Sequence, residues 1–335
     1  FEKIRKSGTY DDTTLTQMLL ALKIDLELFE YVDSLKNDDI EETFWKNQNW
    51  HMLNDEESVV FAVEKYMKFN RPIAVLNTIS HLRVSRKLES DFLIKILEEL
   101  DLSIENEPKH VRLDHHFVRD VFEDLQNREG LDIDRMAQIE YKFLFLFDRL
   151  GHGIIPKYLY QAIAKAPSLY MDFVKNQFFP DDDDLREKEI AKYDPQVRKQ
   201  LGENAYYILS NFNLIPGLQA DGTITAKELN TWIDEVRKLA IENHRPLVTD
   251  RKIGELLARY PNQGEPLFFP EVICDTLERL NSKDVYFGFR MQVFNRQSFT
   301  SRPAGSGGFI ERDRAEHFNS LADDIKITHP NVAAV

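Results

Sequence analysis

The stretch TLTQMLLALKIDLELFEYVDSL, residues 14–35, carries the pattern that decides the fold class. Its leucines Leu15, Leu19, Leu22 and Leu26 recur at spacings of four, three and four residues, which places them on one face of an α-helix. Similar helical periodicity returns along most of the chain, whereas the apolar alternation that is typical of strands is nearly absent. The sequence therefore predicts an all-α protein.

Residues that cap or begin helices divide this pattern into segments joined by short turns. Ser, Thr, Asp and Asn favour the position before a helix, because their side chains accept hydrogen bonds from its first backbone N–H groups. Proline is favoured in the first turn, and glycine ends helices. We predict helix starts at Asn54 or Asp55, Pro72, Ser90 or Asp91, Asp114, Asp132 or Asp134, Pro156 and Ser168, and stops at Gly130 and Gly151.

The architecture expected from this alternation is an irregular α-helical repeat array of TPR- or HEAT-like helix pairs, or a helical bundle. Only 13 Gly and 13 Pro are present, which favours helices over an all-β chain rich in hairpins. No fixed repeat period matches a known consensus. One segment stays open, because the Tyr, Phe and Val content of residues 283–302 fits either a short strand pair near 285–300 or a further helix.

Four consecutive aspartates, Asp181–Asp184, mark the clearest boundary in the sequence. Like charges in a row repel one another and do not pack into a core, so we predict a solvated acidic linker at 181–195. A site for calcium or a basic partner is the alternative for this stretch. The predicted domains are a helical-repeat region at 1–180 and a C-terminal helical domain at 196–335.

Composition indicates which classes of partner and which cellular compartment are favoured. The 335 residues carry a formal net charge of −14, and an acidic surface repels phosphate backbones, which argues against nucleic acid as a partner. The single cysteine, Cys274, has no partner for an internal disulfide, which fits a reducing, cytoplasmic location. No run approaches the roughly 18 apolar residues of a membrane span. Because the chain begins at Phe1 and stops in the apolar NVAAV, we expect a piece of a longer polypeptide.

The segment at 214–240 contains an Asp-Gly dipeptide followed six residues after the glycine by Glu228, like the second half of a calcium-binding EF-hand loop. The early ligand positions of such a loop would fall on Gly217 and Gln219, although Ca²⁺ takes six to eight oxygens. We therefore interpret the dipeptide as a turn, Thr225 as the N-cap of the next helix and Glu228 as its capping-box partner.

Two further motifs are candidates for a metal site and for a catalytic nucleophile, and we predict neither. Asp114, His115 and His116 are adjacent, but side chains of adjacent residues on a helix diverge by about 100°, so we read a cap followed by surface histidines and predict no metal and no cofactor. Cys274 lies in an apolar segment that raises the pKa of a thiol, so we interpret it as a buried core residue rather than a nucleophile.

A glycine-rich turn surrounded by arginines is the best small-ligand candidate. Backbone N–H groups before a helix can hold an anion, and guanidinium groups bind phosphate or carboxylate. The strand and the lysine of a nucleotide-binding loop are missing, and the simpler interpretation is a flexible turn with solvated arginines. The candidate ligand residues are Arg290, Arg296, Arg302, Gly305, Gly307, Gly308 and Arg312, with Arg314 nearby.

Four stretches resemble the helical C-terminal parts of large, poorly characterised bacterial multidomain proteins. Together they cover most of residues 50–320. The resemblance implies a sensor or scaffold region behind an effector domain, as in antiviral defence proteins, and it supplies no catalytic residues. The matching stretches are LNDEESVVFAVEKYMKFNRPIAVLNTI (53–79), LDIDRMAQIEYKFLFLFDRLGHGIIPKYLYQAIAKAPSLYMDFV (131–174), IPGLQADGTITAKELNTWIDEVRKLA (215–240) and NRQSFTSRPAGSGGFIERDRAEHF (295–318).

Three functional hypotheses follow. The first is a non-enzymatic helical scaffold or recognition module of a larger bacterial protein, which contacts another protein or other domains of its parent chain. The alternative is a ligand-binding or enzymatic domain that uses the arginine-rich turn at 290–314 on phosphorylated or nucleotide ligands. A weaker third hypothesis is contact with nucleic acid through the same arginines, which predicts binding that falls steeply with salt.

Overall fold

The computed structural model describes residues 1–48, 53, 55–100, 115–147, 154–261, 269–296 and 308–334. Every regular element in these ranges is helical, and the β-structure in them is confined to an isolated bridge between Leu218 and Ile224. The all-α prediction is confirmed. Among the described residues, none of the helices combines the length and apolar content that crossing a bilayer requires.

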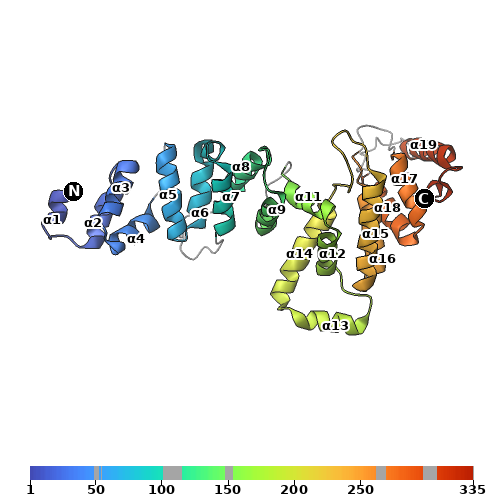
Figure 1. The fold of residues 1–335 in the computed structure, drawn as a ribbon, viewed down its shortest axis with the longest axis horizontal. Helices are drawn as coiled ribbons and strands as arrows, with labels where there is room; N and C mark the ends of the chain where they lie inside the picture. The colour runs from blue at the N-terminus through green and yellow to red at the C-terminus, as the bar shows by residue number, and fades with distance from the viewer. Residues whose placement is uncertain are drawn as a thin grey trace. The chain divides into compact units, whose positions relative to one another are not determined.

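The chain divides into two compact units, Phe1–Lys157 and Tyr158–Val335. In the first unit, coloured blue to green in Figure 1, the helices lie side by side, and α2 packs on α4, α5 on α6 and α6 on α8. Its elements are α1 (Glu2–Lys6), α2 (Asp12–Leu20), α3 (Leu26–Ser34), α4 (Asp38–Asn47), α5 (Glu56–Lys68), α6 (Pro72–Ser80), the 3₁₀ turn His81–Arg86, α7 (Ser90–Glu99), α8 (His115–Gln126), α9 (Ile133–Lys142) and α10 (Leu144–Phe147).

The second unit, yellow-green to red in Figure 1, contains the longer helices. Helix α12 packs on α14 and α15, and α16 packs on α15 and α18. The elements are α11 (Lys157–Lys165), α12 (Pro167–Gln177), α13 (Asp183–Lys192), α14 (Pro195–Asn211), α15 (Ala226–Glu242), α16 (Pro246–Leu257), α17 (Glu271–Leu280), α18 (Lys283–Arg296), α19 (Phe309–Ile325) and α20 (Pro330–Ala333).

Several predicted helix starts agree with the structure. Asp55 and Asp132 cap α5 and α9 through their carboxylates, and α6 begins at Pro72. Helix α7 starts at Ser90, as predicted, but Ser90 is its first residue rather than its cap, and the N-cap Glu89 makes no side-chain capping hydrogen bond. Asp114 and Gly151 lie outside the described residues.

The opening stretch is not one helix. Helix α2 ends at Leu20, and the carboxylate of Asp25 accepts a hydrogen bond from the backbone N–H of Leu28 (3.1 Å) to begin α3. Leu22, which the leucine spacing places on the buried face, is therefore 45% exposed. Starting a new helix at Asp25 is favoured over extending α2. The Asp25 cap satisfies a backbone N–H group at the start of α3, and Leu28 and Phe29 become buried.

An aromatic cluster and a buried arginine hold the first unit together between α3 and α6. The ring centroids of Phe29 and Trp45 lie 4.8 Å apart, and both rings are fully buried. The Arg71 side chain is buried as well, and its guanidinium lies 4.9 Å from the centre of the Tyr66 ring. Its Nη1 donates to the carbonyls of Trp45 (2.5 Å) and Gln48 (3.2 Å), so the charge is compensated at the end of α4.

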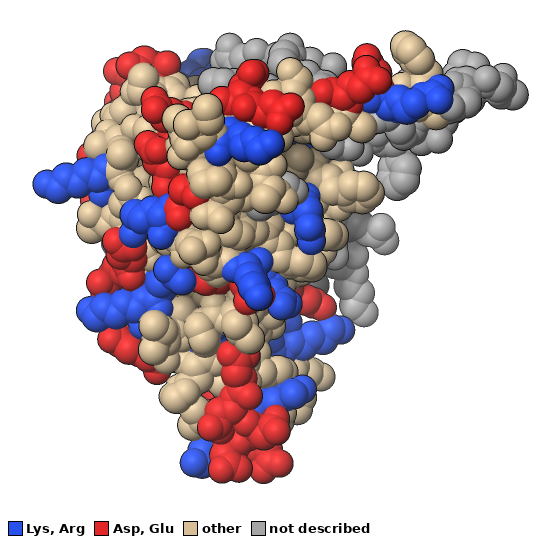
Figure 2. All heavy atoms as spheres, turned by 90° about the vertical axis from the view of Figure 1, so that its right-hand side faces the viewer, with Lys and Arg blue, Asp and Glu red and all other residues tan. Residues whose placement is uncertain are grey.

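The predicted acidic linker at 181–195 contains the helix α13, and it lies within the second unit. The Asp181 N–H donates to the carbonyl of His244 (2.9 Å), and the buried Arg245 donates to the Glu189 carboxylate (2.5 Å). Acidic side chains gather at the lower end of the face in Figure 2, at the height where Figure 1 draws α13. The four aspartates are exposed, and the chain is helical beyond the N-cap Asp182.

The segment left open near 285–300 is helical as far as Arg296, and residues 297–300 lie outside the described ranges. Helix α18 packs closely on α16 at two glycines. A Cβ on Gly254 would lie 2.0 Å from the carbonyl oxygen of Val285, and a Cβ on Gly288 would lie 1.9 Å from that of Arg251. Only the absence of side chains lets the two backbones approach this closely.

Candidate functional site

A groove of about 810 Å³ in the second unit is the best candidate site. We call it the Trp232 groove. It lies between α11 and the start of α12 on one side and α15 on the other, with the loop before α15 at one end. Its lining residues are Gln161, Ala164, Lys165, Pro167, Leu214, Ile215, Pro216, Gly217, Leu218, Gln219, Thr225, Lys227, Glu228, Thr231, Trp232 and Glu235.

The floor of the Trp232 groove is apolar, and contacts among three helices hold it in place. Trp232 and Ile215 are buried, with 4% and 1% of their surface exposed. The Trp232 indole N–H donates to the backbone carbonyl of Ile163 (3.2 Å), and its ring packs edge-on against Tyr170 with centroids 5.0 Å apart. These contacts join α15 to α11 and α12, so the floor is formed before any ligand binds.

A tight hairpin closes one end of the groove. The Asp221 carboxylate accepts hydrogen bonds from the N–H (2.9 Å) and hydroxyl (2.7 Å) of Thr223, and hydrogen bonding lowers the pKa of this carboxyl. Gly217 has φ +79°, and a Cβ there would lie 2.9 Å from the carbonyl oxygen of Thr225, so glycine is required. The Asp-Gly segment is a turn, as interpreted, and Asp221 is engaged within it.

The start of α15 partly corrects the sequence interpretation. Thr225 is the N-cap residue, as predicted, but its side chain makes no capping hydrogen bond. The Gln219 side-chain amide instead donates to the Thr225 hydroxyl (3.2 Å) and to the Gly217 carbonyl (3.1 Å). The predicted capping box with Glu228 is therefore not formed, and Glu228 is free to face the groove.

The rim of the Trp232 groove presents both signs of charge. Lys165 lies at the end of α11, and Lys227 and Glu228 lie in the first turn of α15. All three are exposed, and none forms an ion pair with another described residue. Glu235 is already engaged, because Lys238 lies 3.3 Å from its carboxylate. An extended or helical peptide with apolar and charged side chains matches this arrangement.

The arginine-rich site predicted from sequence is described in part. Arg296 is engaged, because its Nη1 donates to the carbonyls of Ala258 (2.5 Å) and Tyr260 (3.1 Å) at the end of α16. Arg290 is exposed on α18, and Arg312 is exposed on α19 after its N-cap Gly308. Arg302, Gly305 and Gly307 lie outside the described residues, so ligand binding by this turn stays a prediction.

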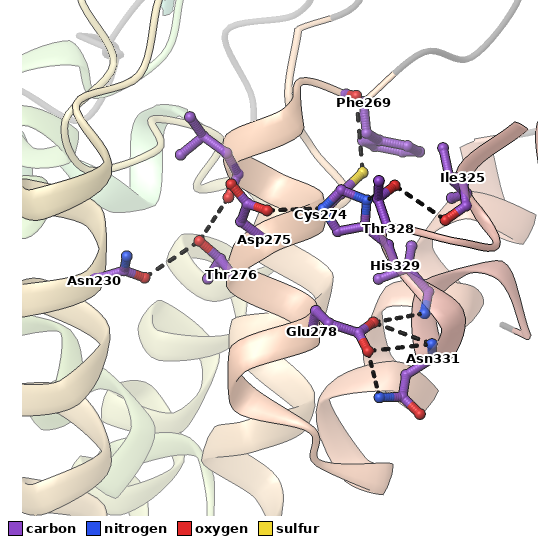
Figure 3. Close-up of polar contacts among 12 residues, drawn as sticks. Asn230, Phe269, Cys274, Asp275, Thr276, Glu278, Ile325, Thr328, His329 and Asn331 are labelled. Carbon is purple, nitrogen blue, oxygen red and sulfur yellow. Dashed lines mark hydrogen bonds and ion pairs between the residues drawn. The ribbon is translucent and has the colours of Figure 1, made fainter.

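Figure 3 shows a polar cluster that contains a cysteine, an acid and a histidine near one another. The Nε2–H of His329 donates to the Asp275 carboxylate (2.8 Å), and its Nδ1 forms a hydrogen bond with the Thr328 hydroxyl (2.9 Å). Both ring nitrogens therefore have partners other than Cys274, whose sulfur lies 3.9 Å from the Phe269 carbonyl oxygen. Cys274 is buried, as predicted, and this burial raises the pKa of its thiol to about 11.

The contacts of Glu278 in Figure 3 hold the C-terminal helix α20 on α17. The Glu278 carboxylate accepts hydrogen bonds from the N–H (3.1 Å) and side-chain amide (2.5 Å) of Asn331 and from the N–H of Val332 (3.3 Å). These donors lie in the first turn of α20, where a carboxylate is favoured. We interpret the cluster as the attachment of α20 to α17.

Histidines at 115 and 116 begin α8, and Asp114 lies outside the described residues. Within the part of the chain that the structure describes, no three His, Cys, Asp or Glu side chains are placed to hold a metal ion.

The sequence predicts the turn and the helix start within residues 214–240 but not the groove that they help to form. The groove needs α11 beside α15, and these helices are separated by about 60 residues of chain. The Pro216-Gly217 dipeptide was the available signal, since it marks the turn that closes the groove. No family model, curated protein or solved structure matches the chain.

Proposed function

We propose that the chain is a non-enzymatic helical recognition module of a larger bacterial protein. It binds a peptide segment of another protein, or of another domain of its parent chain, in the Trp232 groove. The observation that carries this proposal is the groove itself, with its preformed apolar floor and with rim charges of both signs that form no ion pair with another described residue. A preformed floor favours binding, because little conformational entropy is lost when the ligand arrives.

The dimensions and chemistry of the groove support a peptide ligand. Ligand sites in proteins typically occupy about 300–1,000 Å³, and the volume of about 810 Å³ lies within that range. Half-buried Leu214 and Leu218 and the buried Trp232 offer apolar contacts along the floor. Lys227 and Glu228 on the rim then select the register of the peptide through its charged side chains.

The test is selection of peptides from a random display library on the immobilised protein, followed by binding measurements with the selected peptides. Thr231 is exposed on α15 and lines the groove, so Thr231→Arg fills the groove without disturbing the core. Glu242→Arg is the matched control, because Glu242 is exposed on the same helix and does not line the groove. We expect the selected peptides to bind the control variant and to lose at least about tenfold in affinity for Thr231→Arg.

Two results would contradict the proposal. One is a selection that enriches no peptide above background. The other is equal binding of the selected peptides to both variants, which would place their site elsewhere on the molecule. Hydrogen exchange on the complex adds a direct map, since occupation of the groove protects the hairpin amides around Gln219.

A further inference from the structure

A second groove, of about 940 Å³, lies in the first unit between α3 and α5. We call it the acidic groove, because five of its described lining side chains are carboxylates and none of those described is basic. Its lining residues are Leu26, Glu30, Asp55, Glu56, Glu57, Val60, Phe61 and Glu64.

Helical spacing explains how acidic and apolar side chains come to share this groove. On α5, Glu57, Phe61 and Glu64 recur at spacings of four and three, so they lie on one face over successive turns. On α3, Leu26 and Glu30 are one turn apart. Glu30 comes from α3, and the other four carboxylates come from α5 and its N-cap Asp55.

The groove contains the Phe61 ring, and the Lys65 ammonium lies 5.5 Å from the centre of this ring. Phe61 is only half-buried, although its ring stacks on that of Phe29 with centroids 5.9 Å apart. Val60 and Leu26 are half-buried as well. This concave apolar surface distinguishes the site from a solvated cluster of acids, because covering it removes apolar surface from water.

The carboxylates of the acidic groove differ from the acids next to them. The adjacent Lys65 forms ion pairs with Asp33 and with Glu41 (2.9 Å), so these neighbouring acids are neutralised. By contrast, no described base forms an ion pair with any of four groove carboxylates, and the fifth, Asp55, accepts hydrogen bonds from Ser58 as a helix cap. The four carboxylates without such a partner are Glu30, Glu56, Glu57 and Glu64.

We infer that the acidic groove binds a basic amphipathic helix of a partner protein. The inference rests on the proposed recognition role and specifies a partner class at a second surface. Apolar side chains at helical spacing cover Phe61 and Val60, while lysine or arginine side chains on the flanks neutralise the repulsion among the carboxylates. Nucleic acid is excluded from this surface by charge, since phosphates would meet five carboxylates.

The experiment uses a fluorescent leucine–lysine peptide of about four helical turns, with leucines at spacings of three and four. Two control peptides separate the contribution of the amphipathic arrangement from that of charge. One is a scrambled peptide of the same composition, and the other has glutamate in place of lysine. We expect the amphipathic basic peptide to bind more tightly than the scrambled one, the acidic peptide not to bind, and the affinity to fall as salt is added.

Charge reversal locates the site. The double variant Glu57→Lys/Glu64→Lys should weaken binding by about tenfold or more. Glu99→Lys/Glu129→Lys is the matched control, because both residues are exposed carboxylates of the first unit outside the groove. It changes the net charge equally and should leave affinity nearly unchanged.

Three results would overturn the inference: no binding of the basic amphipathic peptide, equal weakening by the two double variants, or equal affinity for the scrambled peptide. The last two would indicate general attraction to an acidic protein. Peptides selected on the Trp232 groove should bind Glu57→Lys/Glu64→Lys normally. Failure of the acidic groove would therefore leave the proposed recognition role standing, and failure of the Trp232 groove would be seen separately.

Discussion

The two units use different packing to stabilise the same kind of secondary structure. In the first unit, side chains fill the space between helices, and Arg71 crosses the core to reach the carbonyls of Trp45 and Gln48. In the second unit, α16 and α18 touch backbone to backbone at Gly254 and Gly288. Side-chain packing tolerates modest changes of side-chain volume. Where two helix backbones touch at glycines, there is no space for any added side-chain atom.

The two kinds of packing also differ in how well the sequence predicts them. Large apolar residues at helical spacing predict a buried face directly. A glycine inside a helix is unfavourable by itself, because it lowers the stability of the helix by about 1 kcal/mol relative to alanine. In α18 that cost is offset by the close packing that Gly288 permits, and the sequence pattern gives no sign of this.

Gly288→Ala should give the largest effect and test the backbone crossing directly. The new Cβ would lie 1.9 Å from the Arg251 carbonyl oxygen, so α16 and α18 must separate. We expect the second unit to lose about 3 kcal/mol of unfolding free energy, measured by thermal and urea denaturation followed by circular dichroism.

Gly202→Ala in α14 is the matched control, because its Cβ would lie 3.6 Å from the Asn176 carbonyl oxygen, an ordinary contact. It should stabilise the protein by about 0.5–1 kcal/mol. If Gly288→Ala were as stable as Gly202→Ala, the close crossing of α16 and α18 would be wrong.

Arg71→Met should give the next largest effect and tests side-chain packing in the first unit. Methionine preserves much of the aliphatic volume but removes the hydrogen bonds to two carbonyls and the contact with the Tyr66 ring. We expect a loss of about 2 kcal/mol in unfolding free energy. Arg135→Met, which breaks the exposed pair with Glu98, should cost less than about 1 kcal/mol. Equal losses would show that burial of Arg71 contributes little.

Glu278→Ala should have a local effect of about 1 kcal/mol, since it removes the carboxylate that caps the first turn of α20. Hydrogen exchange at the Val332 amide should become faster, while exchange in α16 stays unchanged. Glu242→Ala, on an exposed surface of α15, is the control. Unchanged protection of Val332 would contradict the attachment of α20 through Glu278.

The smallest expected effect concerns pH and the first unit. Burial by itself raises the pKa of the Glu41 carboxyl, but hydrogen bonds from Lys68 and Lys65 outweigh it, and the net pKa is lowered. A lowered pKa in the folded state stabilises the protein above the unfolded value, and this stability is lost as pH falls through the folded value.

Glu41→Gln should therefore reduce stability at neutral pH and make the acid limb of the stability curve shallower. Urea denaturation at a series of pH values from about 7 to 3 measures this. Glu99→Gln is the control, because Glu99 is exposed and forms no ion pair with a described residue. The same acid limb in wild type and Glu41→Gln would contradict the role of the Lys65–Glu41–Lys68 cluster.

The sequence by itself determined the all-α class and many helix starts, because the signals for both are local. Asp55 and Asp132 cap the helices that immediately follow them, and periodic apolar residues such as Leu229, Trp232 and Ile233 become buried. These features depend on neighbours within one or two turns. A residue-by-residue pattern is therefore enough to find them.

Tertiary structure decided the close crossing of α16 and α18, the helix within the acidic stretch and both grooves. The helix α13 is held by Arg245, which lies 56 residues from Glu189, and the Trp232 groove needs α11 beside α15. The acidic groove likewise needs Glu30 of α3 across from Glu57 of α5. Each depends on which distant segments meet in space, and helical periodicity gives the buried face of a helix but not the helix that covers it.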